Sequence, residues 1–302
     1  MPAMKDIPAH FTTEYATNWE HLAQMKMTKM RECVQVDTVE GKEKKYNQFD
    51  STEMDAVTVR AGDTRISDTN MPSRWLRPYP LDKAFLFDEW DERFLGQVVL
   101  PQSESVQSHA YAYNRAVDRT IVKAALNVAY TGEIGVDATP LPPAQTIPVN
   151  FVETGSAANS GLTIGKIRQA KYMLDSADID DEDPRYLALT AKSLQDLLRT
   201  TEVTSADYNN VKALVDGAVN TFLGFTLKRI SNKILPIDTV TDIRTCFAWA
   251  KSGIKITDSG RNVHIDVRPD KSHALQIRTV AALGGTRMEE CKVVGIYCDE
   301  SP

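Results

Sequence analysis

One uninterrupted helical pattern, over residues 104–130, constrains the fold of this 302-residue chain more than any other feature. Apolar side chains recur in it at spacings of three and four residues, which places them on one face of a helix. These side chains are Val106, Ala110, Tyr113, Val117, Ile121, Ala124 and Val128. Most charged side chains, among them Asp118 and Arg119, fall outside that face, and no Gly or Pro occurs before Gly132. The pattern predicts a helix roughly 40 Å long, which exceeds the thickness of a small domain.

The composition is that of an ordinary globular protein, with 42% hydrophobic and 25% charged residues, enough to bury a sizeable core. The net charge of −6 argues against a dedicated nucleic-acid binder, which needs a concentrated basic face. It leaves open a protein that encloses nucleic acid. The sequence has no run of eighteen apolar residues, so we expect no membrane span. Residues 1–11 lack the apolar core of a signal peptide, which predicts a chain made and kept in the cytosol.

The motifs expected of catalysis or metal binding are missing. Residues 161–166 approximate a phosphate-binding loop, but the spacing of its glycines is one residue short. Ile167 also stands where Ser or Thr must reach a metal, so we interpret this stretch as a loop before a helix. The acidic run at 178–183 lacks the central Gly of a calcium loop, and we interpret it as a solvated turn. The cysteines are expected to be reduced, mostly buried thiols: Cys33, Cys246, Cys291 and Cys298. The sequence therefore predicts no enzyme, no cofactor and no metal.

Residues 1–32 have the features of an N-terminal arm. An aromatic and aliphatic face repeats at helical spacing, and it consists of Phe11, Tyr15, Trp19 and Leu22. A short isolated helix is marginally stable in water, so this face must be buried against something else. Either its own domain or a neighbouring subunit could cover it, and the sequence alone leaves the two alternatives open; we expect these four residues at a subunit interface.

Residues 33–88 form a long excursion that offers strands but little core. Alternating residues predict strands at 33–38 and 44–49, with a turn at 40–42 between them, and residues 50–73 are mostly polar. A segment of this length without a core is uncommon inside a compact domain. The preserved alternation favours a β-arm that pairs with another chain over a disordered segment. We expect four of its residues at a subunit interface: Lys44, Tyr46, Phe49 and Trp75.

The rest of the chain mixes helices and strands without βαβ repetition, which predicts an α+β fold. An extended linker with four prolines is expected at 139–148. Helices are expected at 163–174, 191–199, 205–217 and 242–251, the last carrying Cys246, Phe247 and Trp249. Strands are expected at 185–190, 222–230 with an interruption at Gly224, 254–257, 263–267, 274–283 and 293–298.

Seven short runs, taken in their order and spacing, resemble the major capsid proteins of tailed bacteriophages. They are 87–91 (FDEWD), 111–119 (YAYNRAVDR) with the alanine-rich turns up to Gly132, 191–198 (AKSLQDLL), 203–208 (VTSADY), 222–225 (FLGF), 283–287 (LGGTR) and 293–296 (VVGI). None of the runs is catalytic. The resemblance covers roughly residues 33–298, which is most of the chain.

The resemblance implies the Hong Kong 97-type fold. Residues 1–32 would then be the N-terminal arm, and 33–90 the extended loop, a β-hairpin that lies across a neighbouring subunit. The helix at 104–130 would be the spine helix of a peripheral domain. That domain would comprise 91–160 and 254–285, and an axial domain would comprise 161–253 and 286–302.

The function that the resemblance implies is structural. The chain would be the major capsid protein of a tailed bacteriophage, self-assembling as pentamers and hexamers into an icosahedral shell around double-stranded DNA. Such a shell assembles in the host bacterial cytoplasm and ends in the virion. A scaffolding protein, a portal and a decoration protein are further candidate partners, and no membrane is involved. Two alternatives are an encapsulin-type nanocompartment shell and a cytosolic enzyme with an unrecognised site.

Overall fold

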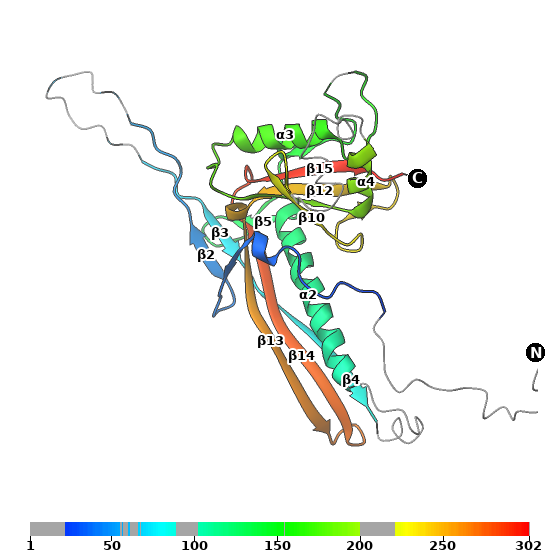
Figure 1. Ribbon diagram of the computed structural model, residues 1–302. Coiled ribbons are helices and arrows are strands. Elements are labelled where there is room, and N and C mark those ends of the chain that lie inside the picture. Colours follow the sequence, from blue (N-terminus) through cyan, green and yellow to red (C-terminus); the bar gives the residue numbers. More distant parts are fainter. Residues whose placement is uncertain are drawn as a thin grey trace, which may run out of the picture. The chain divides into compact units, whose positions relative to one another are not determined.

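The computed structural model describes residues 22–54, 56, 60, 66, 68–88, 102–153, 155–199 and 221–301 (Figure 1). The helix expected at 205–217 lies outside these residues, as do Phe11, Tyr15 and Trp19 of the arm. The chain divides into two compact units. The first contains the described parts of Met1–Met27, Pro80–Asn114 and Gly260–Ala281, and the second contains those of Thr28–Tyr79, Arg115–Ser259 and Ala282–Pro302.

The long helix is confirmed as α2 (Gln102–Leu126), with 25 residues. It ends four residues earlier than expected, because residues 129–131 form a strand, and Val128 is exposed. Val117 and Ile121 are buried, as the apolar pattern predicts. Asp118 is buried too, contrary to the expectation that it lies outside the buried face. Its carboxylate tolerates burial because backbone N–H groups donate to it.

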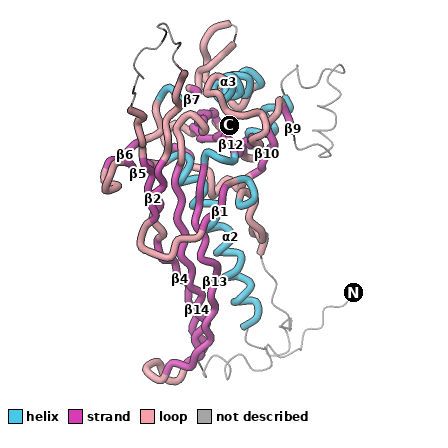
Figure 2. The backbone as a smooth tube through the Cα atoms, turned by 90° about the vertical axis from the view of Figure 1, so that its left-hand side faces the viewer, coloured by secondary structure: helices cyan, strands magenta, loops and turns pink. Residues whose placement is uncertain are grey.

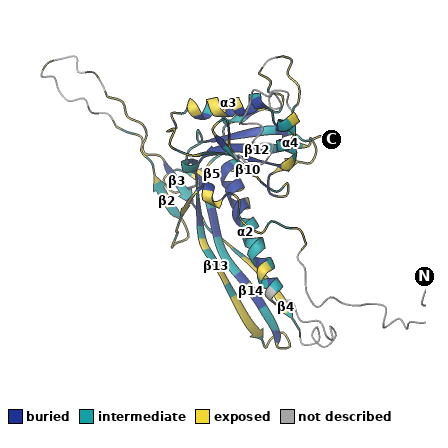
Figure 3. Ribbon diagram, in the orientation of Figure 1, coloured by how far each residue is buried: buried dark blue, intermediate teal, exposed yellow. Residues whose placement is uncertain are grey.

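A seven-stranded mixed sheet dominates the second unit, with strand order β7-β15-β12-β8-β10-β9 and β11 paired to β12. Its strands are β7 (Thr146–Ile147), β8 (Arg185–Leu189), β9 (Thr221–Phe222), β10 (Phe225–Arg229), β11 (Ile237–Asp238), β12 (Ile243–Ala250) and β15 (Val293–Asp299). Helix α3 (Ile164–Asp175) lies over β15 and β12 (Figure 1). Its buried face, which includes Ile167 and Leu174, shares a core with strand residues such as Val294. The outward face of α3 is exposed (Figure 3).

The prediction of a helix over residues 242–251 is wrong, because this segment is the central strand β12. Cys246 and Ala248 belong to the core shared with α3. The alternate positions, Phe247 and Trp249, are also fully buried. A strand buried on both faces is a continuous apolar run without the period of two that marks a half-buried strand, so periodicity alone cannot distinguish it from a buried helix.

Helix α3 begins where the sequence predicts, with Thr163 as its N-cap. Lys166 in its first turn is fully buried, and its ammonium donates to four backbone carbonyl oxygens. Those acceptors are Val149 at 3.0 Å, Ser160 at 2.7 Å, Gly161 at 3.0 Å and Tyr297 at 2.9 Å. Burial lowers the pKa of Lys166. The Lys166 ammonium therefore crosslinks α3, the loop before it and β15.

The predicted interruption at Gly224 is a reversal of the chain rather than a break in one strand. Leu223 and Gly224 both have positive φ, at 50° and 85°, and β9 pairs antiparallel with β10 across them. Two central residues with positive φ match the twist of a tight β-hairpin. The predicted strand at 185–190 and helix at 191–199 are confirmed as β8 and α4 (Ala191–Arg199).

A second sheet has the strand order β1-β13-β14-β4. Its strands are β1 (Gln35–Asp37), β4 (Tyr79–Phe87), β13 (Ile254–Arg268) and β14 (Ala274–Arg287), and the last three run side by side (Figure 2). The strands expected separately at 254–257 and 263–267 are one strand of 15 residues. β1 pairs in parallel with β13, so the bend at 40–42 does not close a hairpin between β1 and the following strand.

A third sheet has the order β2-β3-β5-β6. Its strands are β2 (Lys44–Asn47), β3 (Ser73–Leu76), β5 (Ala129–Thr131) and β6 (Asp137–Thr139). Three short 3-10 helices complete the described elements: η2 (Arg31–Cys33), η3 (Pro143–Gln145) and η4 (Lys251–Gly253). All four cysteines are free, and only Cys291 is partly exposed. None of the described helices combines the length and apolar character needed to cross a membrane.

Candidate assembly interface

The β2–β3 hairpin projects from the third sheet. Its strands pair antiparallel from Lys44↔Leu76 to Asn47↔Ser73. Two further backbone hydrogen bonds, ending with Asp50 N to Asn70 O at 3.2 Å, extend the ribbon. Past that point the chain continues away from the base of the hairpin (Figure 1). Apolar side chains on either side of Asp50 are exposed, including Phe49 at 76% and Met54 at 102%. We call residues 50–54 the hairpin tip.

The base of the hairpin is fixed to its own subunit through Asp37 of β1. The Asp37 carboxylate accepts hydrogen bonds from Lys44 Nζ at 2.8 Å and from the Tyr46 hydroxyl at 2.6 Å. These bonds hold the pKa of Asp37 at about 2. Burial, and then the Asp37 carboxylate, raise the pKa of Tyr46. Lys255 Nζ lies 4.3 Å from the centroid of the Tyr46 ring, a cation–π contact. The contacts found for Lys44 and Tyr46 are therefore within one chain.

Trp75 fixes the other strand of the hairpin to the β5–β6 turn. Its indole Nε1 donates to Gly132 O at 2.8 Å. Its ring packs against Gly135, where an added Cβ would lie 2.6 Å from the ring Cγ and the backbone has φ +69°. Gly135 therefore satisfies both a close approach and a left-handed conformation. Of the other residues expected at an interface, Leu22 and Phe49 are exposed. That all these residues contact a neighbouring subunit stays a prediction.

Buried charges that the sequence analysis missed join the hairpin base to the end of α2. Arg287 is fully buried, and its Nη1 donates to Ala125 O at 2.8 Å and to Asn127 O at 2.9 Å. These carbonyls lie at the C-terminus of α2, where helix carbonyls have no partner within the helix. Glu290 in turn forms an ion pair with Arg74 of β3. A charged residue at the end of an apolar strand was the only sequence signal for this arrangement.

Asp118 holds the chain that enters from the N-terminal arm. Its carboxylate accepts from Lys29 N at 3.1 Å and from Met30 N at 3.3 Å, and the Met30 side chain is fully buried. Burial raises the pKa of Asp118 to about 6, although these backbone hydrogen bonds oppose the rise. The arm therefore enters the second unit over a buried carboxylate on α2.

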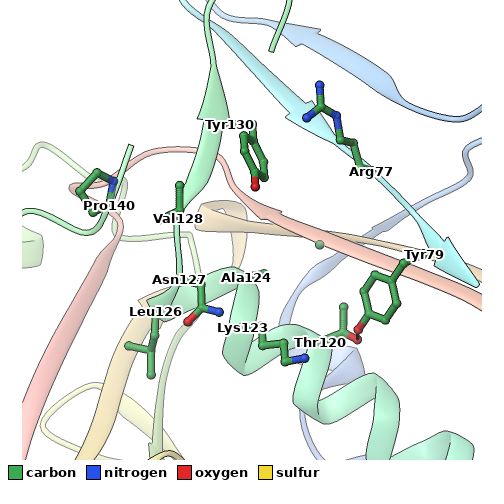
Figure 4. Close-up of a pocket in the computed structure, with 11 residues that line it drawn as sticks. Arg77, Tyr79, Thr120, Lys123, Ala124, Leu126, Asn127, Val128, Tyr130 and Pro140 are labelled. Carbon is green, nitrogen blue, oxygen red and sulfur yellow. Dashed lines mark hydrogen bonds between the residues drawn. The ribbon is translucent and has the colours of Figure 1, made fainter. Parts of the chain in front are cut away.

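A cavity of about 420 Å³ opens beside the C-terminal end of α2 (Figure 4). Arg77 and Lys123 are the charged residues among those that line it, and no carboxylate does. Its apolar lining comes from Ala124, Leu126, Val128 and Pro140. The Tyr79 hydroxyl lies 2.7 Å from Thr120 Oγ1 at one side. We call this hollow the docking cavity; its residues come from four separate stretches of chain, which no sequence motif would bring together.

Comparison with solved structures identifies the fold. The fold is the Hong Kong 97-like fold of phage capsid subunits, in agreement with the α+β prediction. The capsid of Ralstonia phage GP4 matches with a TM-score of 0.71 and 10% identity, covering 100% of this chain and 99% of that one. The capsid of cyanophage P-SCSP1u matches with a TM-score of 0.69 and 14% identity, covering 97% and 94%. A chain of Mycobacterium phage Che8 matches with a TM-score of 0.66 and 15% identity, covering 96% of this chain and 98% of that one.

A family model described as phage capsid protein matches residues 7–300, and the chain belongs to this family. It is a phage major capsid protein, as the sequence runs indicated. A search of curated proteins finds no sequence match.

Proposed function

We propose that copies of this capsid protein join into pentamers and hexamers through the projecting hairpin and the N-terminal arm, and close an icosahedral shell around double-stranded DNA. The role is structural and involves no catalytic turnover. In this proposal residues 33–90 act as the extended loop, α2 is the spine of a peripheral domain, and the seven-stranded sheet with α3 forms the axial domain. Assembly takes place in the host cytoplasm, with scaffolding, portal and decoration proteins as candidate partners.

The exposure of apolar side chains along the outer part of the hairpin is the observation that carries the proposal. Phe49, Met54 and Ile66 are 76%, 102% and 90% exposed in the isolated subunit. Burying one such side chain against a partner contributes about 1.5–3 kcal/mol. A contact of this size is weak alone, but a closed shell repeats it in every subunit, and linked contacts reinforce one another.

Electron microscopy of the purified protein, combined with nuclease digestion, tests the proposal. We expect closed icosahedral particles, and double-stranded DNA that resists nuclease in particles filled during phage growth. Particles that contain a stoichiometric protein cargo and no protected DNA would favour the encapsulin alternative. A compact monomer in analytical ultracentrifugation, at every concentration reached, would contradict shell formation and favour an enzyme.

A further inference from the structure

We propose that the docking cavity beside α2 receives the hairpin tip of a second copy of the chain, with Met54 against its apolar lining and Glu53 beside its cations. The inference rests on the proposed shell function and specifies which side chains meet.

The cavity calls for a ligand that is apolar in part and negatively charged in part. Arg77 and Lys123 supply positive charge, and Glu43 neutralises only part of it, through an ion pair of its Oε2 with Arg77 Nε at 2.8 Å. The Arg77 guanidinium also lies 5.1 Å from the centroid of the Tyr130 ring, which keeps the cation at the cavity rather than free in solvent. Lys123 is exposed. An acidic side chain next to an apolar one satisfies both parts of the lining.

The hairpin tip offers this combination. Met54 is fully exposed, and Glu53 beside it in the sequence is exposed as well. Methionine is unbranched and polarizable, so its side chain adapts to irregular apolar hollows. Asp50, three residues before Glu53, adds a second negative charge to the hairpin tip.

The cavity lies at the root of the hairpin, and the hairpin tip lies farther out along the same hairpin. Arg77 directly follows β3, so the cavity lies at the root. Met54 lies seven residues past the end of β2, a reach of about 23 Å for extended chain. The full exposure of Met54 shows that it is not in its own subunit's cavity. A contact of the hairpin tip with the cavity is therefore a contact between two copies, and such a head-to-tail contact generates a ring when the rotation between successive copies closes.

A disulfide crosslink tests the contact directly. Val128 lines the cavity and is 44% exposed, so the Met54→Cys/Val128→Cys protein should form intersubunit disulfide ladders when assembled particles are oxidised. The matched control is Met54→Cys/Val152→Cys, because Val152 is 41% exposed but does not line the cavity. The Met54→Cys single variant accounts for pairing with the partly exposed native Cys291. Ladders in the first protein alone support the proposal; ladders in neither, or equally in both, overturn it.

A charge exchange tests the recognition. Lys123→Glu should raise the protein concentration needed for assembly about fivefold or more, and adding Glu53→Lys should return it to within about twofold of the wild type. Lys171→Glu, at an exposed site on α3, is the control and should leave assembly unchanged. Wild-type assembly by Lys123→Glu, or no rescue by the second change, would overturn the docking while shell formation itself stands.

If the cavity instead serves a small anion, added phosphate should change assembly and no specific ladder should form. Failure of the wild type to form shells would instead defeat the proposed function.

Discussion

Nearly every side chain of β12 is buried, whereas intermediate and exposed side chains alternate along β2 and every residue from Phe49 to Met54 is exposed. The core of the second unit, built from α2, α3 and β12, obtains its stability within one chain. It even buries charges, Lys166, Asp118 and Arg287, each with hydrogen-bond partners from other segments. The base of the hairpin is held to its own subunit by hydrogen bonds of Tyr46 and Trp75. Farther out, the apolar side chain of Met54 is exposed.

This difference separates two kinds of residue. Changes in the core should act on folding of the subunit, and changes in the hairpin tip should act on assembly alone. The following predictions test that separation by their effect on subunit stability, beginning with the strongest.

Replacing Ile121 with Asp should prevent folding. The side chain is fully buried mid-way along the apolar face of α2, and an unpaired carboxylate there costs about 5 kcal/mol or more. We expect the variant in the insoluble fraction. Arg119→Ala, two residues earlier and exposed, should remain soluble and folded. Equal solubility of the two would show that this face of α2 is not part of the core.

Lys166→Met should destabilise the subunit by about 4 kcal/mol, because four partly buried carbonyl oxygens lose the ammonium that they share as a donor. The midpoint of denaturant unfolding followed by circular dichroism measures the loss. Lys171→Met on the same helix is exposed and should shift stability by less than about 0.5 kcal/mol. Equal unfolding midpoints for Lys166→Met and Lys171→Met would show that the hydrogen bonds of the Lys166 ammonium do not stabilise the core.

Asp118 should make the core's stability depend on pH. Its pKa rises from 3.8 to about 6 on folding, so the folded state binds a proton more tightly than the unfolded state. The resulting stabilisation is fully present below pH 3.8 and is lost as the pH rises through about 6, a change on the order of 2–3 kcal/mol. Unfolding free energies of wild type and Asp118→Asn, measured from pH 4 to 8, should diverge by this amount. Parallel curves for the two proteins would contradict the assignment.

Local patterns predicted several elements of this fold. The helix α2 and the strands β8 and β15 follow from apolar spacing or alternation. The strand β12 was predicted as a helix instead. Cys246 and Trp249 point to opposite faces of the sheet that are both buried, so the period of two that marks a strand disappears. Strand partners were also beyond local patterns, since β1 pairs with residues 255–257, more than two hundred positions away.

The candidate site was predicted less completely, for a related reason. Charged residues are mostly exposed in proteins, so Asp118, Lys166 and Arg287 were not expected in the interior. Each becomes tolerable only through backbone groups that the fold brings from distant segments. Trp75 and Tyr46 were expected to contact a neighbour, but the sequence could not show that their own subunit already holds them at the hairpin base.

Replacing residues 51–69 with a short Gly/Ser turn tests the central claim most directly, because the change begins beyond Asp50 and Asn70, the outermost backbone hydrogen bond of the ribbon among the residues that the structure describes. The deletion removes no buried side chain among the described residues, so we expect the unfolding free energy to change by less than about 1 kcal/mol. Sedimentation velocity and electron microscopy of the same sample should then show folded, soluble subunits and no closed shells. Normal shells from this variant would contradict the account, because they would show that the hairpin tip is not the contact that joins one subunit to the next.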